Sequence, residues 1–329
     1  MDLIVSEDYI KHLNMVPPPP PKSFKFNAIT YGNSKFVAVG KDILISFDAS
    51  LNIISMSTTT GGVNTNYVSV AYGNIFVAVT NNKNTIAYTN DGIIWTSVTT
   101  YTGYWNSITY GNGKFVAVGN GPINKIMYNE VNNVVTKFNN SYVIKNEDNT
   151  PNTTLYRLVS LTNITFGKTE DNVDIFVAIG SPHIIFSTNG KDWYTPYTKI
   201  TNTTLLTIGY GNGWFVIMCA DNKILWSSNG NFFYSSLRQI SNNYKSIAFF
   251  DNIFLAISDD IKDTYIGQNI LYSTKDPNIM FTTDQSKLDN WALTNGIKNA
   301  WKSVAYGNNM LLAVSDKSNF LLKIIPVKR

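Results

Sequence analysis

Short apolar runs alternate with polar, glycine-containing turns along almost the whole chain, and this pattern predicts β-strands. Its clearest unit is residues 105–119, Trp-Asn-Ser-Ile-Thr-Tyr-Gly-Asn-Gly-Lys-Phe-Val-Ala-Val-Gly. Residues 107–110 and 115–118 are rich in β-branched and aromatic side chains, which favour strands. The Gly-Asn-Gly between them supplies the positive φ that a tight turn needs. The unit therefore predicts a two-stranded hairpin.

Recognisable copies of this hairpin recur along the chain and indicate a repeat fold. Each second strand is a continuous apolar run of the Phe-Val-Ala-Val type, as expected for strands that are covered on both faces. Each first strand ends on an aromatic residue: Tyr31, Tyr72, Tyr110, Phe166, Tyr210, Phe249 and Tyr306. Most of the intervals between these residues are close to the ~40 residues of one four-stranded propeller blade. A third strand follows in each unit, and a more polar fourth strand follows it in every unit except the last.

The predicted fold is all-β, a seven-bladed β-propeller of four-stranded antiparallel blades. The last unit has too little chain after its second strand for two more strands, and a propeller ring closes best without an exposed edge. Residues 3–5, Leu-Ile-Val, are expected to supply the missing strand, and the proline run 17–21 to act as a stiff spacer or a docking ligand. Residues 1–25 are thus the closing strand and spacer, and 26–329 a single propeller.

Two units are longer than the others, which predicts insertions at about residues 120–161 and 259–300. The first insertion is rich in Asn, and the second carries several Asp residues and Trp291. Insertions of this kind usually form loops at one end of a propeller, where binding surfaces lie. They are therefore candidate functional segments, although they can also be simple additions to the fold.

A second motif, Ser/Thr-x-Asp/Asn-Gly, marks the turn between third and fourth strands in three units. Its residues are Thr89, Asp91, Gly92 and Trp95; Ser187, Asn189, Gly190 and Trp193; and Ser227, Asn229 and Gly230. The Asp or Asn accepts backbone N–H bonds, the Gly allows positive φ, and the aromatic residue folds back between sheets. The pattern resembles the Asp-box propellers, which include BNR (sialidase-type) and photosystem II assembly factor-like repeats. That resemblance implies a structural role for these turns and no catalytic one.

The repeated blade sequence, of the type Ala/Ser-Val-Ala-Tyr-Gly-Asn-Gly-Lys-Phe-Val-Ala-Val-Gly, also resembles propellers of large DNA viruses and of phage tail or fibre proteins. This resemblance covers about residues 26–325. It implies a viral structural or virion-associated protein, located in the virion or the host cytoplasm. No N-terminal basic signal segment and no apolar run of the roughly 20 residues needed to span a bilayer are present, so neither secretion nor membrane insertion is expected.

Charge and composition argue against several functions. The net charge of +4 is small for this length, and arginine occurs only at Arg157, Arg238 and Arg329, so nucleic-acid binding is not predicted. The scattered arginines also argue against sialidase chemistry. The single Cys219 lies in an apolar run and is expected to be a buried, inert thiol.

Few residues are suited to catalysis. The only histidines are His12 and His183, which makes a Ser-His-Asp or metal-centred site improbable, and His183 is interpreted as a turn residue. A glycoside hydrolase using paired Asp residues, tested first at Asp259, Asp260 and Asp263, is the enzyme alternative. The spacing of these residues does not match a calcium loop. No enzyme activity, cofactor or metal is therefore predicted.

Binding is the function that the sequence favours, with a protein or a glycan as the partner. Tyrosine, tryptophan and asparagine side chains suit both kinds of partner. The candidate binding residues are Tyr101, Tyr104, Tyr194, Tyr197 and Trp291. Each can alternatively cover a blade, and an intracellular scaffold that uses the proline run is a third possible function.

Overall fold

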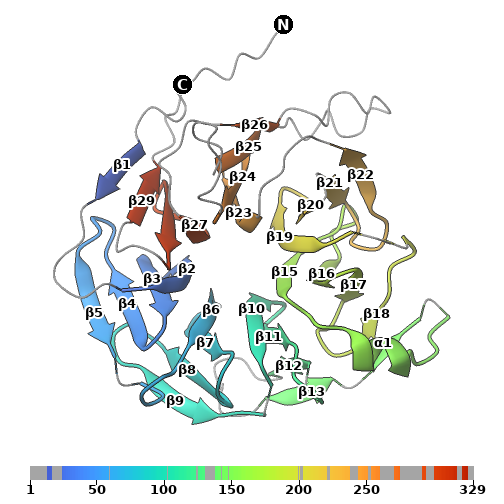
Figure 1. The fold of residues 1–329 in the computed structure, drawn as a ribbon, viewed down its shortest axis with the longest axis horizontal. Helices are drawn as coiled ribbons and strands as arrows, with labels where there is room; N and C mark the ends of the chain where they lie inside the picture. Colours follow the sequence, from blue (N-terminus) through green and yellow to red (C-terminus); the bar gives the residue numbers. More distant parts are fainter. Residues whose placement is uncertain are drawn as a thin grey trace, which may run out of the picture.

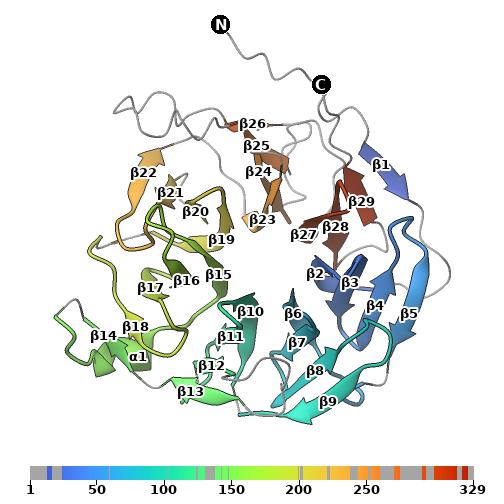
Figure 2. The same cartoon turned by 180° about the vertical axis from the view of Figure 1, so that it is seen from behind.

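Seven sheets, all antiparallel except for one parallel strand pair in the fourth, stand around a central axis in the computed structural model (Figure 1), and Figure 2 shows the same ring from behind. The structure describes residues 13–16, 24–58, 60–101, 103–123, 125–129, 138–141, 143–146, 148–198, 200, 203–220, 223–237, 244–250, 253–259, 270–274, 291–293, 300–316 and 321–324. Predictions made for residues 3–5, for the proline run 17–21, and for Asp260 and Asp263 fall outside these ranges. The predicted all-β propeller with seven blades is confirmed.

Each blade runs from an inner to an outer strand. Blade 1 contains β2 (Phe26–Gly32), β3 (Lys35–Gly40), β4 (Ile43–Phe47) and β5 (Ile53–Ser57). Blade 2 contains β6 (Tyr67–Tyr72), β7 (Phe76–Thr80), β8 (Thr85–Thr89) and β9 (Thr96–Thr99). Blade 3 contains β10 (Trp105–Gly111), β11 (Lys114–Gly119), β12 (Ile126–Tyr128) and β13 (Asn139–Ser141).

The other blades follow the same order, with one exception. Blade 4 contains β15 (Asn163–Lys168), β16 (Asp174–Gly180), β17 (His183–Ser187), β18 (Trp193–Tyr194) and a fifth strand, β14 (Ile144–Lys145). Blade 5 contains β19 (Leu205–Gly211), β20 (Trp214–Cys219), β21 (Lys223–Ser227) and β22 (Tyr234–Leu237). Blade 6 contains β23 (Tyr244–Phe250), β24 (Ile253–Ser258), β25 (Ile270–Thr274) and β26 (Trp291–Leu293).

Blade 7 closes the ring with a strand from the other end of the chain. It contains β27 (Trp301–Gly307), β28 (Met310–Ser315) and β29 (Leu321–Ile324), and β1 (Leu13–Val16) pairs antiparallel with β29. Closure by an N-terminal strand is therefore confirmed, but the choice of residues 3–5 for that strand is wrong. A continuous apolar run was the wrong criterion, because an outermost strand is covered less than a central one and tolerates a mixed sequence such as Leu-Asn-Met-Val.

The apolar second strands form the core between neighbouring blades. Phe115, Val116, Ala117 and Val118 of β11 are at most 1% exposed, and the other second strands are buried in the same way. Because both faces are covered by adjacent sheets, the middle of each of these strands is a continuous apolar run instead of an alternating pattern. Cys219, at the end of β20, is buried as predicted.

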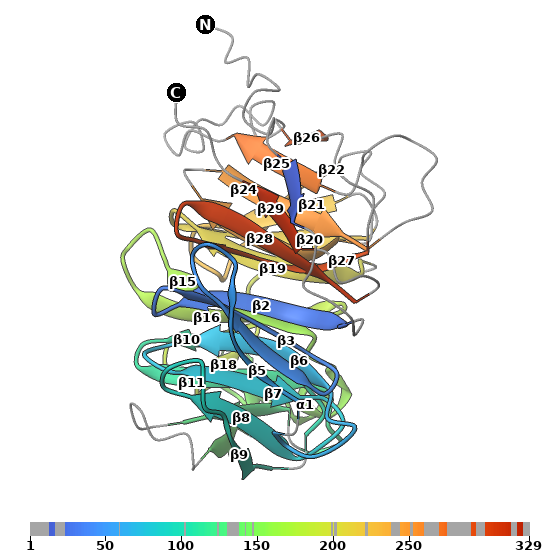
Figure 3. The ribbon, with the colours of Figure 1, turned by 90° about the vertical axis from the view of Figure 1, so that its left-hand side faces the viewer.

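A ring of aromatic residues joins each inner strand to the next blade. The aromatic residue that ends an inner strand lies on the glycine of the preceding blade, so a Cβ on Gly111 would be 2.0 Å from Cγ of Phe166. The pairs are Gly32 with Tyr72, Gly73 with Tyr110, Gly111 with Phe166, Gly167 with Tyr210, Gly211 with Phe249, and Gly307 with Tyr31. In the remaining link Phe250 replaces glycine and stacks on Tyr306, with ring centroids 5.6 Å apart. The Gly307–Tyr31 pair joins blade 7 to blade 1, whose inner strands lie side by side (Figure 3).

The three Ser/Thr-x-Asx-Gly turns share one hydrogen-bond pattern. Thr89 Oγ1 donates to Asp91 Oδ1 at 2.8 Å and accepts from the Gly92 backbone N–H at 3.1 Å, while Asp91 Oδ1 accepts from the backbone N–H groups of Ile93 and Ile94. The turns that begin at Ser187 and Ser227 repeat these bonds. The motif thus satisfies the turn's own backbone donors.

Each of these turns also packs against the preceding blade. A Cβ on Gly190 would lie 2.9 Å from Val116 of blade 3, and Trp193 is fully buried among residues of blades 3 and 4. The glycines have φ between 70° and 76°, a region that favours glycine. Positive φ and close approach together explain why glycine occupies this position.

Asp91 offers a test of this pattern, because Asn stands at the matching positions 189 and 229. The Ile93 backbone N–H, followed by the Thr89 hydroxyl, holds the pKa of Asp91 below its usual value. A carboxylate with a lowered folded pKa stabilises the fold above its unfolded pKa, and this contribution is lost as pH falls through the folded pKa. We expect Asp91→Ala to cost about 1 kcal/mol at neutral pH. Asp91→Asn keeps the acceptor and should be nearly neutral, with less loss of stability in acid. Urea unfolding at neutral and acidic pH measures both, and equal costs for the two variants would argue against this role.

Candidate functional site

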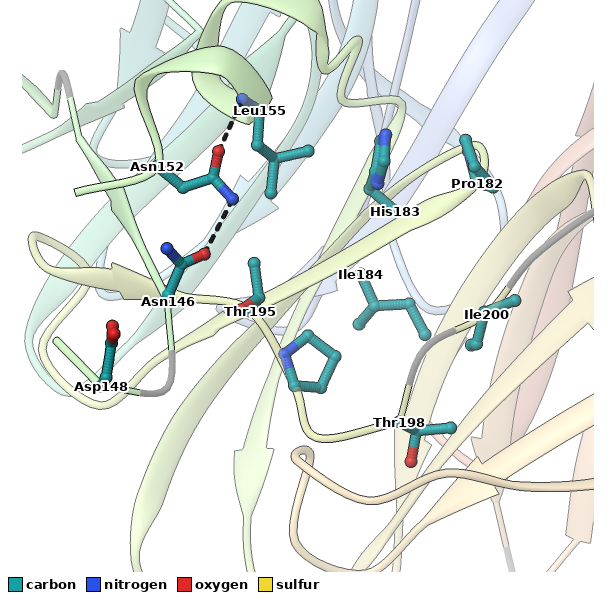
Figure 4. A pocket seen from close by; sticks show the side chains of 11 residues that line it. Asn146, Asp148, Asn152, Leu155, Pro182, His183, Ile184, Thr195, Thr198 and Ile200 are labelled. Carbon is teal, nitrogen blue, oxygen red and sulfur yellow. Dashed lines mark hydrogen bonds between the residues drawn. The ribbon is translucent and has the colours of Figure 1, made fainter. Parts of the chain in front are cut away.

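A pocket of about 660 Å³ lies at the outer side of blade 4, where the repeat is broken (Figure 4). It is lined by Asn146, Asp148, Asn152, Leu155, Pro182, His183, Ile184, Thr195, Pro196, Thr198 and Ile200. These residues come from the first predicted insertion, from the turn between β16 and β17, and from the link between blades 4 and 5. The volume is within the usual range for binding pockets.

The first insertion builds one wall of the pocket on the edge of blade 4. After completing blade 3 it forms β14, which pairs in parallel with β18, so that Lys145 lies opposite Tyr194. The Thr195 backbone N–H donates to the Lys145 carbonyl at 3.0 Å, and Lys145 Nζ lies 3.6 Å from Asp192. The added strand therefore holds the insertion against the segment that follows β18.

Hydrogen bonds fix the loop from β14 to the helix α1 (Thr153–Leu158). The Asn146 backbone N–H donates to the Thr150 carbonyl at 2.8 Å, and Asn152 Nδ2 donates to Asn146 Oδ1 at 2.8 Å. Asn152 Oδ1 accepts from the Leu155 backbone N–H at 2.9 Å, which caps the first turn of α1. The wall is therefore formed before any partner arrives.

Two buried polar side chains tie α1 to blade 3. The Tyr156 hydroxyl bonds to the carbonyls of Ile123 at 2.8 Å and Ser141 at 3.0 Å. Lys125 Nζ donates to the Val159 carbonyl at 2.7 Å, and burial lowers the pKa of this lysine. These bonds set the position of Leu155, the apolar residue that α1 contributes to the pocket.

The opposite side of the pocket is largely apolar. Ile184 and Pro196 are buried, Ile200 is partly buried, and Pro182 precedes His183 at the start of β17. His183 is partly buried, and burial lowers the pKa of its imidazole from its usual value, which favours the neutral ring. It offers one hydrogen-bond donor and one acceptor without a charge.

Two titratable side chains of the described residues line the pocket, Asp148 and His183. Asp148 is exposed at the rim, and hydrogen bonding from the Thr150 side chain and then its backbone N–H lowers the pKa of Asp148. Figure 4 shows Asp148 and His183 on opposite sides of the pocket. A largely apolar side facing a wall with amide groups is suited to binding a ligand in one orientation.

The predicted binding residues lie in three separate parts of the ring. Tyr194 in β18 and Tyr197, which is 60% exposed, are next to the pocket-lining Thr195 and Pro196. Tyr101 and Tyr104 are exposed in the link between blades 2 and 3. Trp291 belongs to β26 of blade 6, where it pairs with Ser273. The structure therefore brings only the tyrosines of blade 4 close to the pocket.

The described residues give no sign of a metal centre or of a membrane span. Within them, no group of three or more His, Cys, Asp or Glu side chains is placed to hold a metal ion. No described helix is both long and apolar enough to cross a bilayer. Asp259, a candidate of the glycosidase alternative, is instead paired with two lysines.

Asn146, Asn152, Leu155 and Ile184 were not predicted from the sequence as pocket residues. The sequence Asn152-Thr153 before a short polar and apolar run is a helix-start signal, and it indicates one wall of the pocket. No local pattern shows that this wall faces residues 182–184 and 195–200. Their proximity depends on the pairing of β14 with β18.

Solved structures with similar folds are β-propellers. The chain is similar to "YCF48 bound to D1 peptide", with a TM-score of 0.65, 13% identity, and coverage of 98% of this chain and 99% of that one. Virginiamycin B lyase from Staphylococcus aureus gives a TM-score of 0.72 at 12% identity, covering 96% and 99%. The WD40 propeller domain of Doa1 gives 0.62 at 12%, covering 97% and 96%. The chain matches no protein-family model and no curated protein sequence. At these identities the similarity shows the fold alone.

Proposed function

We propose that this chain is a non-catalytic interaction module that binds an extended segment of a partner protein in the blade 4 pocket. The observation that carries the proposal is the pocket itself, which forms where an insertion interrupts the repeat and adds a fifth strand. The repeated turns and hairpins are used by the fold. In the interrupted blade, the inserted residues are not needed to form the repeat, and they are therefore available to bind a partner.

The chemistry of the pocket suits a peptide. Leu155, Ile184 and Ile200 offer an apolar surface for one or two side chains of the partner. Asn146, Thr195 and Thr198 contribute amide and hydroxyl groups that pair with a peptide backbone. Part of the wall is hydrogen-bonded in advance, so less ordering is needed when a partner binds.

Two further considerations support a protein partner. A structurally similar propeller, YCF48, has been solved with a bound peptide, so a fold of this kind can present a peptide site. The separation of Asp148 from His183 in the pocket favours binding over acid–base catalysis. A virion-associated role and an Asp-box relationship are narrower versions of the proposal that rest on sequence resemblance. A glycan partner is an alternative that rests on the exposed tyrosine and asparagine side chains.

The proposal is tested by selecting binders from a displayed library of random linear peptides on the full chain. We expect the enriched peptides to share apolar positions, because Leu155, Ile184 and Ile200 line the pocket. Thr195→Arg places a long charged side chain in the pocket and should weaken binding of a selected peptide at least about tenfold. Isothermal titration calorimetry with synthetic copies of the peptides measures the change.

Thr96→Arg is the matched control, since Thr96 is exposed on β9, the outermost strand of blade 2. This variant should bind the selected peptides as the unchanged chain does. Enriched peptides that bind Thr195→Arg as tightly as the unchanged chain would contradict the pocket site. A glycan array run beside the library separates the alternatives, because glycan binding without peptide binding would replace the proposal with the glycan version.

A further inference from the structure

The inner strands enclose a second cavity, of about 430 Å³, along the central channel. Asn, Ser and Thr side chains from several blades line it, among them Asn27, Asn106 and Thr207. In the part of the chain that the structure describes, the charged side chains of this lining are Lys245 of blade 6 and Lys302 of blade 7. Among the described residues, no Asp or Glu lines the channel.

Both lysines occupy the same place in their blades. In blade 6 the pairing of β23 with β24 shifts between Tyr244 and Ser246, so Lys245 is the extra residue of a β-bulge. In blade 7 the pairing of β27 with β28 shifts between Trp301 and Ser303, so Lys302 is the extra residue. Bulges are a common way of redirecting a side chain toward a functional site. The corresponding bulge residues of blades 1, 2, 3 and 5 are uncharged: Asn27, Val68, Asn106 and Leu206.

Two carboxylates that do not line the cavity pair with the lysines. Asp259 follows β24 and Asp316 follows β28, and neither lines the cavity. Asp259 Oδ2 lies 3.4 Å from Lys245 Nζ and 3.0 Å from Lys302 Nζ. Asp316 Oδ2 lies 3.4 Å from Lys302 Nζ. The two ammonium groups thus share one carboxylate oxygen, Asp259 Oδ2, and lie close together.

These contacts keep Lys302 charged. Burial opposes its ammonium form, but hydrogen bonding and Coulombic attraction from Asp259, with help from Asp316, outweigh burial and raise the pKa of Lys302. An ammonium group carries three donors, so a lysine bonded to one carboxylate keeps the capacity to bind another acceptor. The carboxylates therefore fix the lysines without using all of their donor capacity.

Two hydroxyl groups lie next to the lysines in sequence and line the same cavity. Ser246 Oγ accepts from the Val304 backbone N–H at 3.3 Å, and Ser303 Oγ accepts from the Ile29 backbone N–H at 3.2 Å. Because each oxygen is the acceptor in these bonds, each hydroxyl hydrogen remains to donate. This part of the wall thus combines two ammonium groups with two hydroxyl donors.

We propose that the blade 6 and blade 7 side of the central channel binds a small oxyanion, the carboxylate or phosphate group of a low-molecular-weight ligand, through Lys245, Lys302, Ser246 and Ser303. The four residues come from two adjacent inner strands and line one cavity, and the two carboxylates that pair with the lysines do not line it. Charge-assisted hydrogen bonds to oxyanions are the strongest that such groups make. The site is distinct from the blade 4 pocket and does not depend on its function.

The experiment is calorimetric titration of the full chain with inorganic phosphate and, separately, with succinate, at constant ionic strength. The ionic strength is kept constant because added salt by itself screens the charges of the protein and would change the measured heats. We expect a dissociation constant of about 1 mM or lower for at least one probe, and comparison of the two tells whether phosphate or carboxylate is preferred. Lys245→Gln removes one ammonium while Asp259 keeps Lys302, and should weaken binding at least about tenfold.

Lys168→Gln is the matched control, because Lys168 is also paired with a carboxylate, Asp174 at 2.8 Å, but lies outside the channel. It should bind the probes as the unchanged chain does. In the unchanged chain, NMR shifts of the Ser246 and Ser303 amides on addition of the tighter probe give a readout that needs no variant. Absence of binding for both probes, equal binding by Lys245→Gln, or equal weakening by Lys168→Gln would overturn the proposal.

Discussion

Replacing Gly111 by alanine is expected to destabilise the propeller by about 3 kcal/mol. The added Cβ would lie 2.0 Å from Cγ of Phe166 and within 2.4 Å of both ring Cδ atoms, far inside van der Waals contact. The backbone of Gly111 lies outside the positive-φ region, so the cost is steric. Urea unfolding followed by tryptophan fluorescence measures the change in the free energy of unfolding.

Two comparisons separate this explanation from a general effect of losing glycine. Gly213 has φ of 81° and no neighbour within 4 Å of an added Cβ, so Gly213→Ala is expected to cost only about 1 kcal/mol, from backbone strain. In a Phe166→Ala background the ring is absent, and Gly111→Ala should then cost much less than it does alone. Equal costs in the two backgrounds would show that the aromatic contact does not set the requirement for glycine.

Deleting residues 1–16 is expected to lower the melting temperature by about 5 °C or more. The deletion removes β1, which pairs with β29 from Leu13 opposite Ile324 to Val16 opposite Leu321. Blade 7 would then end at β29, with a row of unpaired backbone groups on an open edge. Scanning calorimetry measures the midpoint, and size-exclusion chromatography detects any association through that edge.

Deletion of residues 1–8 is the matched control, since it keeps β1. The melting temperature should then stay close to that of the full chain. If both deletions lower the midpoint equally, the loss of stability does not come from β1, and the assignment of the closing strand to Leu13–Val16 would be wrong.

Much of the fold is predictable from the sequence because the same sequence pattern recurs in each of the seven blades. The aromatic residue at the end of an inner strand recurs in every blade, and the structure shows why, since it packs on the preceding blade. In one blade Phe250 replaces the glycine that follows the aromatic residue. The pattern can still be recognised, because the other six blades have this glycine. The closing strand occurs once, and there propensity alone led to the wrong segment.

The pocket residues could not be predicted in the same way, because they belong to no repeat. Asn152, His183 and Thr195 come from three separate segments, and only the β14–β18 pairing brings those segments together. Aromatic side-chain chemistry alone selects Tyr194 and Tyr197, which lie beside the pocket. The same criterion also selects Tyr101 and Tyr104, which lie in another part of the ring. The type of a residue indicates what it can bind, but which residues lie together in one site can be known only from the pairing of the strands.

A crystal structure of the full chain with a peptide selected from the displayed library is the most direct measurement of the proposed function. The expected result is the peptide in the blade 4 pocket, with an apolar side chain against Leu155 and Ile184 and backbone contacts to Asn146 or Thr195. A peptide bound elsewhere, at the central channel or beside Tyr101 and Tyr104, with the blade 4 pocket empty, would contradict it.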